Sequence, residues 1–215
     1  MPTNIKITKQ MILDTAFEIA RKEGLDGISN RVLAKKMNCS IRPIYYQFKN
    51  VEELNKAVYI KIEKYFYKFL MDHIIEDIPP YKQVGINYIR FAKQEKQFFK
   101  ILFMSETELV PEKFISKDYE DYKEIVKLIK ISTKLNDEDI GNFHTKMWIF
   151  SHGIATLAAS DTVQFTDEQI QQLLSLEFQA LMLLKENPDN KWVLKNGKFQ
   201  GGNEKWKILE MYYGE

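Results

Sequence analysis

Residues 29–48, SNRVLAKKMNCSIRPIYYQF, decide the fold, because they read as two short helices joined by a tight turn. Ser29 is expected to cap the first helix, since a serine hydroxyl accepts a hydrogen bond from the free N–H groups of a first turn. Asn38 is expected to end that helix, because asparagine tolerates a left-handed backbone. Ser40 is expected to cap the second helix, and Pro43 falls in its first turn, where a missing N–H costs no hydrogen bond. The stretch therefore predicts a helix-turn-helix.

A further helix precedes this motif. Thr8 is suited to its N-cap, and Gly24 is suited to its end. Between them the apolar residues recur at helical spacing, at Ile12, Ala16, Phe17 and Ala20. The first fifty residues are thus predicted to form three short helices.

The second helix of the motif carries side chains that suit the major groove of DNA. Arg42 is expected to read a base, because a guanidinium can form two hydrogen bonds with guanine, worth about 1–3 kcal/mol of discrimination. Lys49 and Tyr46 are expected to lie nearer the phosphates, together with Thr8 or Lys9. The full set predicted to contact DNA is Thr8, Lys9, Arg31, Ser40, Ile41, Arg42, Tyr46, Gln47 and Lys49.

The remaining side chains of this helix are assigned to the core. Ile44, Tyr45 and Phe48 are predicted to be buried. For Tyr46 a core position is the alternative to a phosphate contact, although two adjacent tyrosines on so short a helix cannot both face inward.

The charge is distributed unevenly along the chain. Residues 1–50 hold nine basic and four acidic residues, a net charge of +5, whereas the whole chain has a net charge of +1. A basic head on an acidic body is what a protein needs when one end meets a polyanion. Charge clustering without a function is the alternative.

The run from Ile12 to Leu54 resembles the DNA-binding domain of the tetracycline-repressor-like (TetR/AcrR-type) regulators. The features that match are Ala16, Phe17, Gly24, Ile28, Ser29, Leu33, Ala34, Asn38, Cys39, Ser40, IYYQF at 44–48 and EEL at 52–54. The resemblance implies a transcriptional repressor whose remaining residues form an all-helical, ligand-sensing domain. Two positions depart from the family pattern: Asn38 stands where glycine is frequent, and Val51 stands where a phosphate-contacting lysine is frequent. Because valine cannot make that phosphate contact, we expect Lys49 to make it instead.

Composition excludes several classes of protein. With 45% hydrophobic residues, 14 Phe and 11 Tyr, the chain can bury a sizeable core, and 9 Gly and 6 Pro favour long helices with short loops. Cys39 alone can form neither a disulfide framework nor a structural zinc site. Because the sequence shows no signal segment and no apolar run that could span a membrane, we expect a cytoplasmic protein.

Two other kinds of function compete with DNA binding. An enzyme is not expected, because the sequence has no glycine-rich phosphate loop, no Gly-x-Ser-x-Gly elbow and no His-Glu-x-x-His motif. The second alternative is a protein-interaction module whose helix-turn-helix does not bind DNA. Salt-dependent, sequence-selective retention of duplex DNA would distinguish the regulator from both.

The rest of the chain is predicted to be helical, which makes the fold class all-α. Apolar periodicity and N-caps predict helices over 51–75, 81–94, 96–105, 117–131, 137–159 and 167–185. We divide the chain into a DNA-binding domain at 1–50, a ligand-binding and dimerisation domain at 51–187, and an aromatic-rich extension at 188–215.

The last two long helices carry more apolar surface than one core stripe needs. The apolar residues are Ile154, Ala155, Leu157, Ala158 and Ala159 on one helix and Ile170, Leu173, Leu174, Leu176, Leu181 and Leu184 on the next. The family resemblance implies that this pair forms a four-helix interface with its copy, and a homodimer can place two recognition helices in successive major grooves. An internal core of a monomer is the alternative.

The small-molecule effector is expected to be largely apolar or aromatic. His144, Trp148 and His152 lie at i, i+4 and i+8 on one helix face, and Trp148 and the His-Gly pair at 152–153 resemble the C-terminal signature of one subclass of the family. The residues predicted to line the cavity are Tyr88, Phe91, Phe99, Phe103, His144, Trp148 and His152, with plain core packing as the alternative for each aromatic ring. The two histidines lie about 12 Å apart along the helix axis, too far to share a metal ion, so neither a metal nor a cofactor is expected.

The extension after Pro188 is unusually aromatic for a tail. Asn196 and Gly197 stand between two apolar runs, which is typical of a hairpin turn. We expect this segment to pack on the body or on a partner subunit, and a disordered extension is the alternative.

Overall fold

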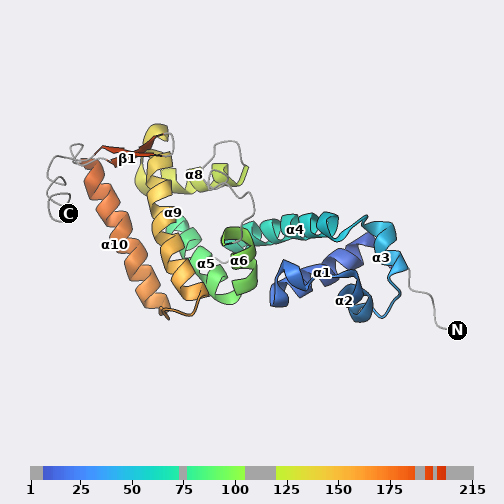
Figure 1. Ribbon diagram of the computed structural model, residues 1–215. Coiled ribbons are helices and arrows are strands. Elements are labelled where there is room, and N and C mark those ends of the chain that lie inside the picture. The colour runs from blue at the N-terminus through green and yellow to red at the C-terminus, as the bar shows by residue number, and fades with distance from the viewer. Residues whose placement is uncertain (1–6, 73–76, 105–119, 187–191, 196–197, 202–215) are drawn as a thin grey trace, which may run out of the picture. The chain divides into compact units, whose positions relative to one another are not determined.

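The computed structural model describes residues 7–72, 77–104, 120–186, 192–195 and 198–201, and helices make up most of these (Figure 1). In chain order the helices are α1 (Lys9–Glu23), the short 3-10 turn η1 (Leu25–Gly27), α2 (Asn30–Lys36), α3 (Arg42–Gln47), α4 (Val51–Asp72), α5 (Pro80–Gln94), α6 (Lys96–Phe103), α8 (Glu120–Thr133), α9 (Asp137–Ala159) and α10 (Asp167–Glu186). The prediction of an all-α fold class is confirmed. The described part contains no helix that is long and apolar enough to cross a membrane.

The chain divides into two compact units. Unit 1 comprises residues 1–74, 87–111 and 155–164, and unit 2 comprises residues 75–86, 112–154 and 165–215. Helices α1–α3 therefore share unit 1 with α4 and α6, because α1 packs against both of those helices. The domain boundary that we place after residue 50 stays a proposal.

The predicted helix ends within residues 1–50, which we call the head, have the expected local causes. The Thr8 hydroxyl accepts a hydrogen bond from the Met11 N–H at 3.2 Å, and the Ser29 hydroxyl accepts one from the Val32 N–H at 3.3 Å. Gly24 follows α1 with a φ of 77°, and Asn38 follows α2 with a φ of 49°, the left-handed region that glycine and asparagine tolerate best. These four predictions are confirmed.

Two local predictions about α3 are wrong. Ser40 does not cap the helix: Ile41 occupies the N-cap position, and its carbonyl accepts hydrogen bonds from the Ile44 and Tyr45 N–H groups. Tyr45 is not buried, because 58% of its surface is exposed. Ile44 and Phe48, one helical turn apart, already fill the inward face of this helix.

Unit 1 has an apolar core along one side of α4. Leu54, Val58, Ile62 and Phe66 recur every four residues on α4 and are at most 1% exposed. Ile12, Ala16, Ile19 and Ala20 of α1 and Phe98, Phe99 and Leu102 of α6 are buried to a similar extent. The head therefore shares one apolar core with α4 and α6, through helix α1.

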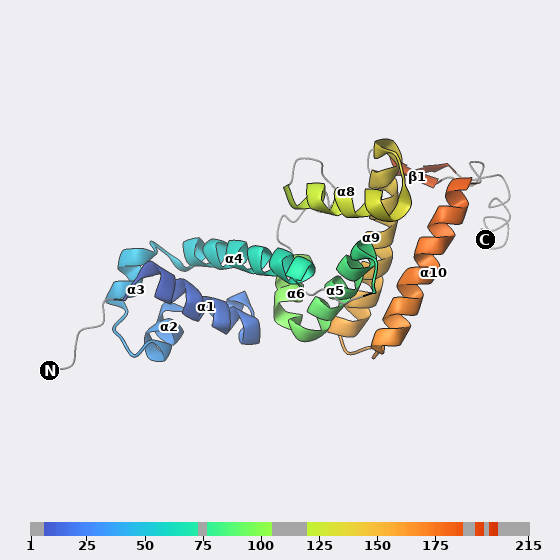
Figure 2. The ribbon, with the colours of Figure 1, turned by 180° about the vertical axis from the view of Figure 1, so that it is seen from behind.

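In unit 2 helices α5, α9 and α10 pack closely, and α9 and α10 lie side by side in both ribbon views (Figures 1 and 2). A side chain at Gly85 of α5 would place its Cβ 3.2 Å from Leu174 of α10, so a glycine permits this approach. Phe143 of α9 and Phe178 of α10 make an edge-to-face ring contact at 5.4 Å.

Helix α10 begins with the predicted capping box. The Thr166 hydroxyl accepts a hydrogen bond from the Gln169 N–H at 3.2 Å, and the Gln169 side chain accepts one from the Thr166 N–H at 2.9 Å. Each residue thus satisfies a backbone donor of the other, which fixes where the helix starts.

The longer helices match their predicted ranges closely. α9 begins and ends at the predicted residues, and the ends of α5, α6 and α10 lie within two residues of prediction. The predicted hairpin is also present: β1 (Trp192–Lys195) pairs antiparallel with β2 (Lys198–Gly201), with Lys195 opposite Lys198. The prediction that this extension packs on the body concerns side chains outside the described residues.

Candidate nucleic-acid interface

Helix α3 presents two tyrosines to solvent over a buried apolar base. Ile44 is fully buried and Phe48 is 3% exposed, whereas Tyr45 and Tyr46 are 58% and 85% exposed. Sequence reasoning missed Tyr45, although the pair of adjacent tyrosines and the i, i+4 spacing of Ile44 and Phe48 could have identified it. An aromatic pair of this kind, with hydroxyls at its tips, can contact both sugar-phosphate and base edges.

The predicted base-reading residue lies on the same helix. Arg42 is the first residue of α3 and is exposed, and Ile41 before it is 36% exposed. Gln47 at the end of α3 is half-buried. Arg42 therefore has room to extend into a groove, and Gln47 has less freedom to do so.

The predicted phosphate-contacting residues surround α3 at the surface. Ser40, Arg31 and Lys49 are exposed, and among the described residues no acidic group forms an ion pair with Arg31 or Lys49. The Lys49 N–H donates to Glu53 Oε2 at 2.9 Å, and the Asn50 side chain accepts from the Glu53 N–H at 2.8 Å. These bonds fix the backbone between α3 and α4 and leave the Lys49 ammonium available.

Lys9 and Thr8 are less free than the other predicted contacts. Lys9 Nζ lies 3.9 Å from Glu53 Oε1 and 4.8 Å from the centre of the Phe48 ring. Both side chains of the Lys9–Glu53 pair are well exposed, so the pair can exchange for a phosphate at small cost. The Thr8 hydroxyl already accepts the α1 capping bond and could still donate its proton.

An ion pair fastens α1 to α4. Lys61 of α4 binds Asp14 of α1, and this contact lowers the pKa of the Asp14 carboxyl below its ordinary value. The Lys61 ammonium also lies 4.7 Å from the centre of the Phe17 ring. The carboxylate is therefore charged at neutral pH, and the helices stay paired.

Four of the residues predicted to line an effector cavity, Tyr88, Phe91, Phe99 and Phe103, are found in one cluster of unit 1. Tyr88, Phe91 and Phe103 each lie with ring centres 5.0–5.8 Å from Phe66, and Phe99 lies 5.0 Å from Phe103. Phe91 and Phe99 are fully buried. The rings pack on one another as a core does, so a role in ligand binding stays a prediction.

The other three predicted effector residues lie in unit 2, on α9. The Tyr81 hydroxyl of α5 makes a 3.0 Å hydrogen bond with His144 Nδ1, and burial raises the pKa of Tyr81, so that the phenol keeps its proton. Trp148 and His152 stack with ring centres 5.2 Å apart. Tyr81 was not among the predicted site residues, because its partner is 63 positions away in the sequence.

The half-buried position of His152 predicts a dependence of stability on pH. Burial lowers the pKa of His152 from its ordinary value of 6.5. The unfolded state therefore binds more protons just below pH 6.5, and the free energy of unfolding falls as the pH drops. We expect the midpoint of thermal unfolding, followed by circular dichroism from about pH 7.5 to about pH 5.5, to fall less in His152→Gln than in the wild type. Equal falls would contradict this assignment.

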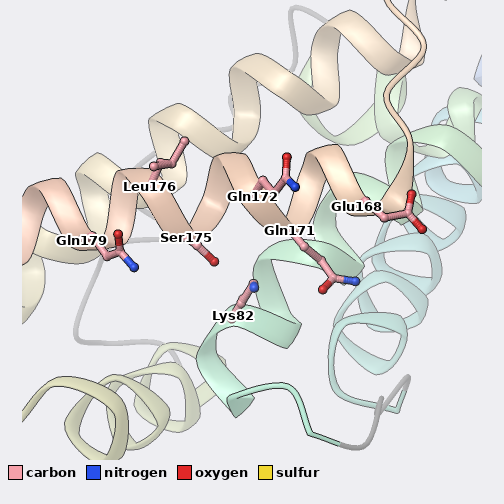
Figure 3. A pocket seen from close by; sticks show the side chains of 7 residues that line it. All are labelled: Lys82, Glu168, Gln171, Gln172, Ser175, Leu176 and Gln179. Atoms are coloured by element: carbon pink, nitrogen blue, oxygen red, sulfur yellow. The ribbon is translucent and has the colours of Figure 1, made fainter.

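An open groove of about 560 Å³ lies in unit 2 between α5 and α10, and Figure 3 shows the side chains that line it. Lys82 of α5 extends toward Ser175 of α10. The other lining residues are Glu168, Gln171, Gln172, Leu176 and Gln179. Six of the seven lining residues are of polar or charged type, and none is a predicted effector residue.

Large apolar side chains are exposed on the last two long helices. Leu176 and Leu183 of α10 are 63% and 66% exposed, and Ile149 of α9 is 47% exposed. Gly153 lies one turn after Ile149, and a side chain there would meet no atom within 4 Å. Single exposed leucines are ordinary, whereas a contiguous apolar patch is typical of an interaction surface.

Comparison with known proteins identifies the fold. No family model matches the sequence, and no curated protein matches it. A TetR-like transcriptional regulator from Rhodococcus sp. RHA1 superimposes with a TM-score of 0.56 at 16% identity, over 84% of this chain and 98% of that chain. A putative TetR-family transcriptional regulator from Vibrio parahaemolyticus gives a TM-score of 0.57 at 18% identity, over 80% and 97%. A protein of unknown function from Rhodococcus sp. RHA1 gives 0.59 at 16% identity, over 85% and 97%. The chain has the helical fold of TetR-like regulators.

Proposed function

We propose that the protein is a transcriptional regulator that binds duplex DNA through α3. The observation that carries this proposal is the outward arrangement of Arg42, Tyr45 and Tyr46 over buried Ile44 and Phe48. A fold shared with transcriptional regulators supports it, as does the positive charge of residues 1–50.

The functional form is a homodimer that meets an inverted-repeat operator. Two recognition helices must stand about 34–36 Å apart to enter successive major grooves on one side of B-DNA. A two-fold axis supplies such a pair from one kind of subunit. The exposed apolar residues of α9 and α10 support these helices as the dimer interface, because a second copy would cover Ile149, Leu176 and Leu183.

The regulator acts as a repressor that a small apolar or aromatic effector releases from the operator. The aromatic cluster of unit 1 and the Trp148–His152 stack of unit 2 support an effector of this chemistry. The effector must favour one arrangement of the heads, and a nearly complete switch needs a preference of about 10⁴-fold between the two arrangements.

Selection of bound sequences from random duplex DNA tests the proposal. We expect an inverted repeat, because each subunit contributes one copy of α3. Recovery of no preferred sequence at low salt would contradict the regulator and favour the protein-interaction module. A single unrepeated site would contradict the dimer.

We also expect affinity for the selected duplex to fall steeply with salt. Bound cations such as Arg31 and Lys49 displace counterions from the phosphates. If the two heads together neutralise about six to eight phosphates, the slope of log affinity against log salt should be about −5 to −7. Fluorescence anisotropy between about 50 and 200 mM salt measures the slope. A slope near zero would contradict a phosphate-binding surface.

A further inference from the structure

One carboxylate joins three helices of unit 1. Glu95 Oε2 accepts a hydrogen bond from Arg21 Nε of α1 at 3.1 Å, and Glu95 Oε1 accepts one from the Tyr65 hydroxyl of α4 at 2.8 Å. Glu95 itself is the residue between α5 and α6. We call Arg21, Tyr65 and Glu95 the Glu95 clamp.

The backbone of Glu95 is held firmly at this corner. Its N–H donates to the Phe91 carbonyl at 2.7 Å, and its carbonyl accepts from the Phe99 N–H at 2.8 Å. The last turn of α5 and the first turn of α6 therefore both use this residue. The backbone from which the Glu95 side chain extends is thus fixed, and that side chain is only 13% exposed.

The Arg21 guanidinium rests on rings from the same part of unit 1. Its central carbon lies 5.2 Å from the ring centres of Phe17 in α1 and Tyr65 in α4, and 5.3 Å from that of Phe98 in α6. The three rings also contact one another, with centres 4.7–5.9 Å apart. Apolar contacts tolerate sliding, whereas directional, charge-assisted hydrogen bonds specify one register.

Lys96, the residue after Glu95, connects the junction of α5 and α6 to the segment that follows α9. Lys96 Nζ binds both carboxylate oxygens of Asp161 at 2.5 Å, just after the end of α9. Consecutive residues at the α5–α6 corner thus hold the head through Arg21 and the end of α9 through Asp161. All of these residues belong to unit 1, which also contains residues 155–159 at the end of α9. The Lys96–Asp161 pair therefore connects the head to the end of a helix that takes part in the proposed dimer interface.

From this geometry we propose that Glu95 is a positioning residue, which sets the separation of the two recognition helices in the dimer. This inference rests on the proposed function. Tyr65 stays protonated as the donor, because burial and the bond to Glu95 raise its pKa. Without the carboxylate charge, Arg21 keeps its ring contacts, but among the described residues its one remaining acidic partner is Glu18 of the same helix, at 3.0 Å. The head then remains folded but turns more freely against α4 and α6.

The experiment measures how affinity depends on the spacing of the half-sites. Full-length protein is titrated with synthetic duplexes that carry the selected inverted repeat, with the half-site separation at its optimum or changed by one base pair. The variants are Glu95→Gln, which keeps the size and removes the charge, and Tyr65→Phe, which removes one hydrogen bond. Glu18→Gln is the matched control, because Glu18 binds the same guanidinium without joining two helices.

We expect the wild type to prefer its optimal spacing and Glu95→Gln to reduce this preference by about fivefold or more, which is the lower end of typical coupling effects. Tyr65→Phe should shift in the same direction, and Glu18→Gln should match the wild type. A merely structural defect would weaken binding equally at every spacing, so an unchanged preference in Glu95→Gln overturns the clamp proposal. A wild type that retains no duplex overturns the proposed function itself, and the clamp's role with it.

Discussion

Leu176→Arg/Leu183→Arg is expected to be monomeric and to bind the selected inverted repeat roughly 10²–10⁴-fold more weakly than the wild type, because the second half-site is no longer bound intramolecularly. Both leucines are more than 60% exposed in the single chain, so arginine is tolerated there without a partner. In a dimer each fully buried leucine stabilises the interface by about 1.5–3 kcal/mol. The two arginines that replace the two leucines would be desolvated there and would repel the arginines of the other copy. Sedimentation velocity measures the assembly state, and anisotropy measures the affinity.

The control for this double variant is Ile131→Arg. Ile131 on α8 is 72% exposed, so the substitution adds a charge at an equally open apolar position outside α9 and α10. It should leave the assembly state and the affinity unchanged. A double variant that stays dimeric would place the dimer interface elsewhere, and loss of dimers in Ile131→Arg as well would point to a general effect of added charge.

Much of the fold follows from local chemistry that the sequence displays directly. Thr8, Ser29 and Thr166 cap the helices that follow them, and Gly24 and Asn38 take the left-handed backbone that their residue types permit. Each of these features depends on residues close to one another in the chain. This is the range over which propensity and periodicity are informative.

The candidate site was harder to predict, because its exposed residues are those that the core has no room to bury. Tyr45 was expected to be buried as an aromatic residue beside Ile44, but the helix has room for only one inward residue per turn. The Glu95 clamp joins positions 30 and 74 apart in the chain, and no local pattern marks such a pairing. The aromatic rings proposed for the effector site separate into two units for the same reason: their residue type indicates burial but not which neighbours they meet.

Arg42→Ala is expected to lower affinity for the selected operator about 10–100-fold for each half-site, which corresponds to about 1–3 kcal/mol for each bidentate base contact that arginine makes and alanine cannot. Affinity for unrelated duplex DNA, measured by anisotropy in the same buffer, should fall much less, because Arg42 is one cation among several on the head. Repeating the selection with the variant should show a relaxed preference at one position of each half-site.

Lys49→Ala is the matched comparison for Arg42→Ala, because it removes a predicted phosphate contact and no base contact. Lys49 is exposed and lies after the end of α3, the proposed recognition helix, so its removal should weaken binding to operator and to unrelated DNA by a similar factor. It should also make the salt slope shallower by about 0.9 for each phosphate that is no longer neutralised, or nearly 2 in a dimer. Arg42 would be a phosphate-binding residue if both variants behaved in this uniform way. Base reading would then pass to the two tyrosines, whose outward position over Ile44 and Phe48 brings them to the same surface.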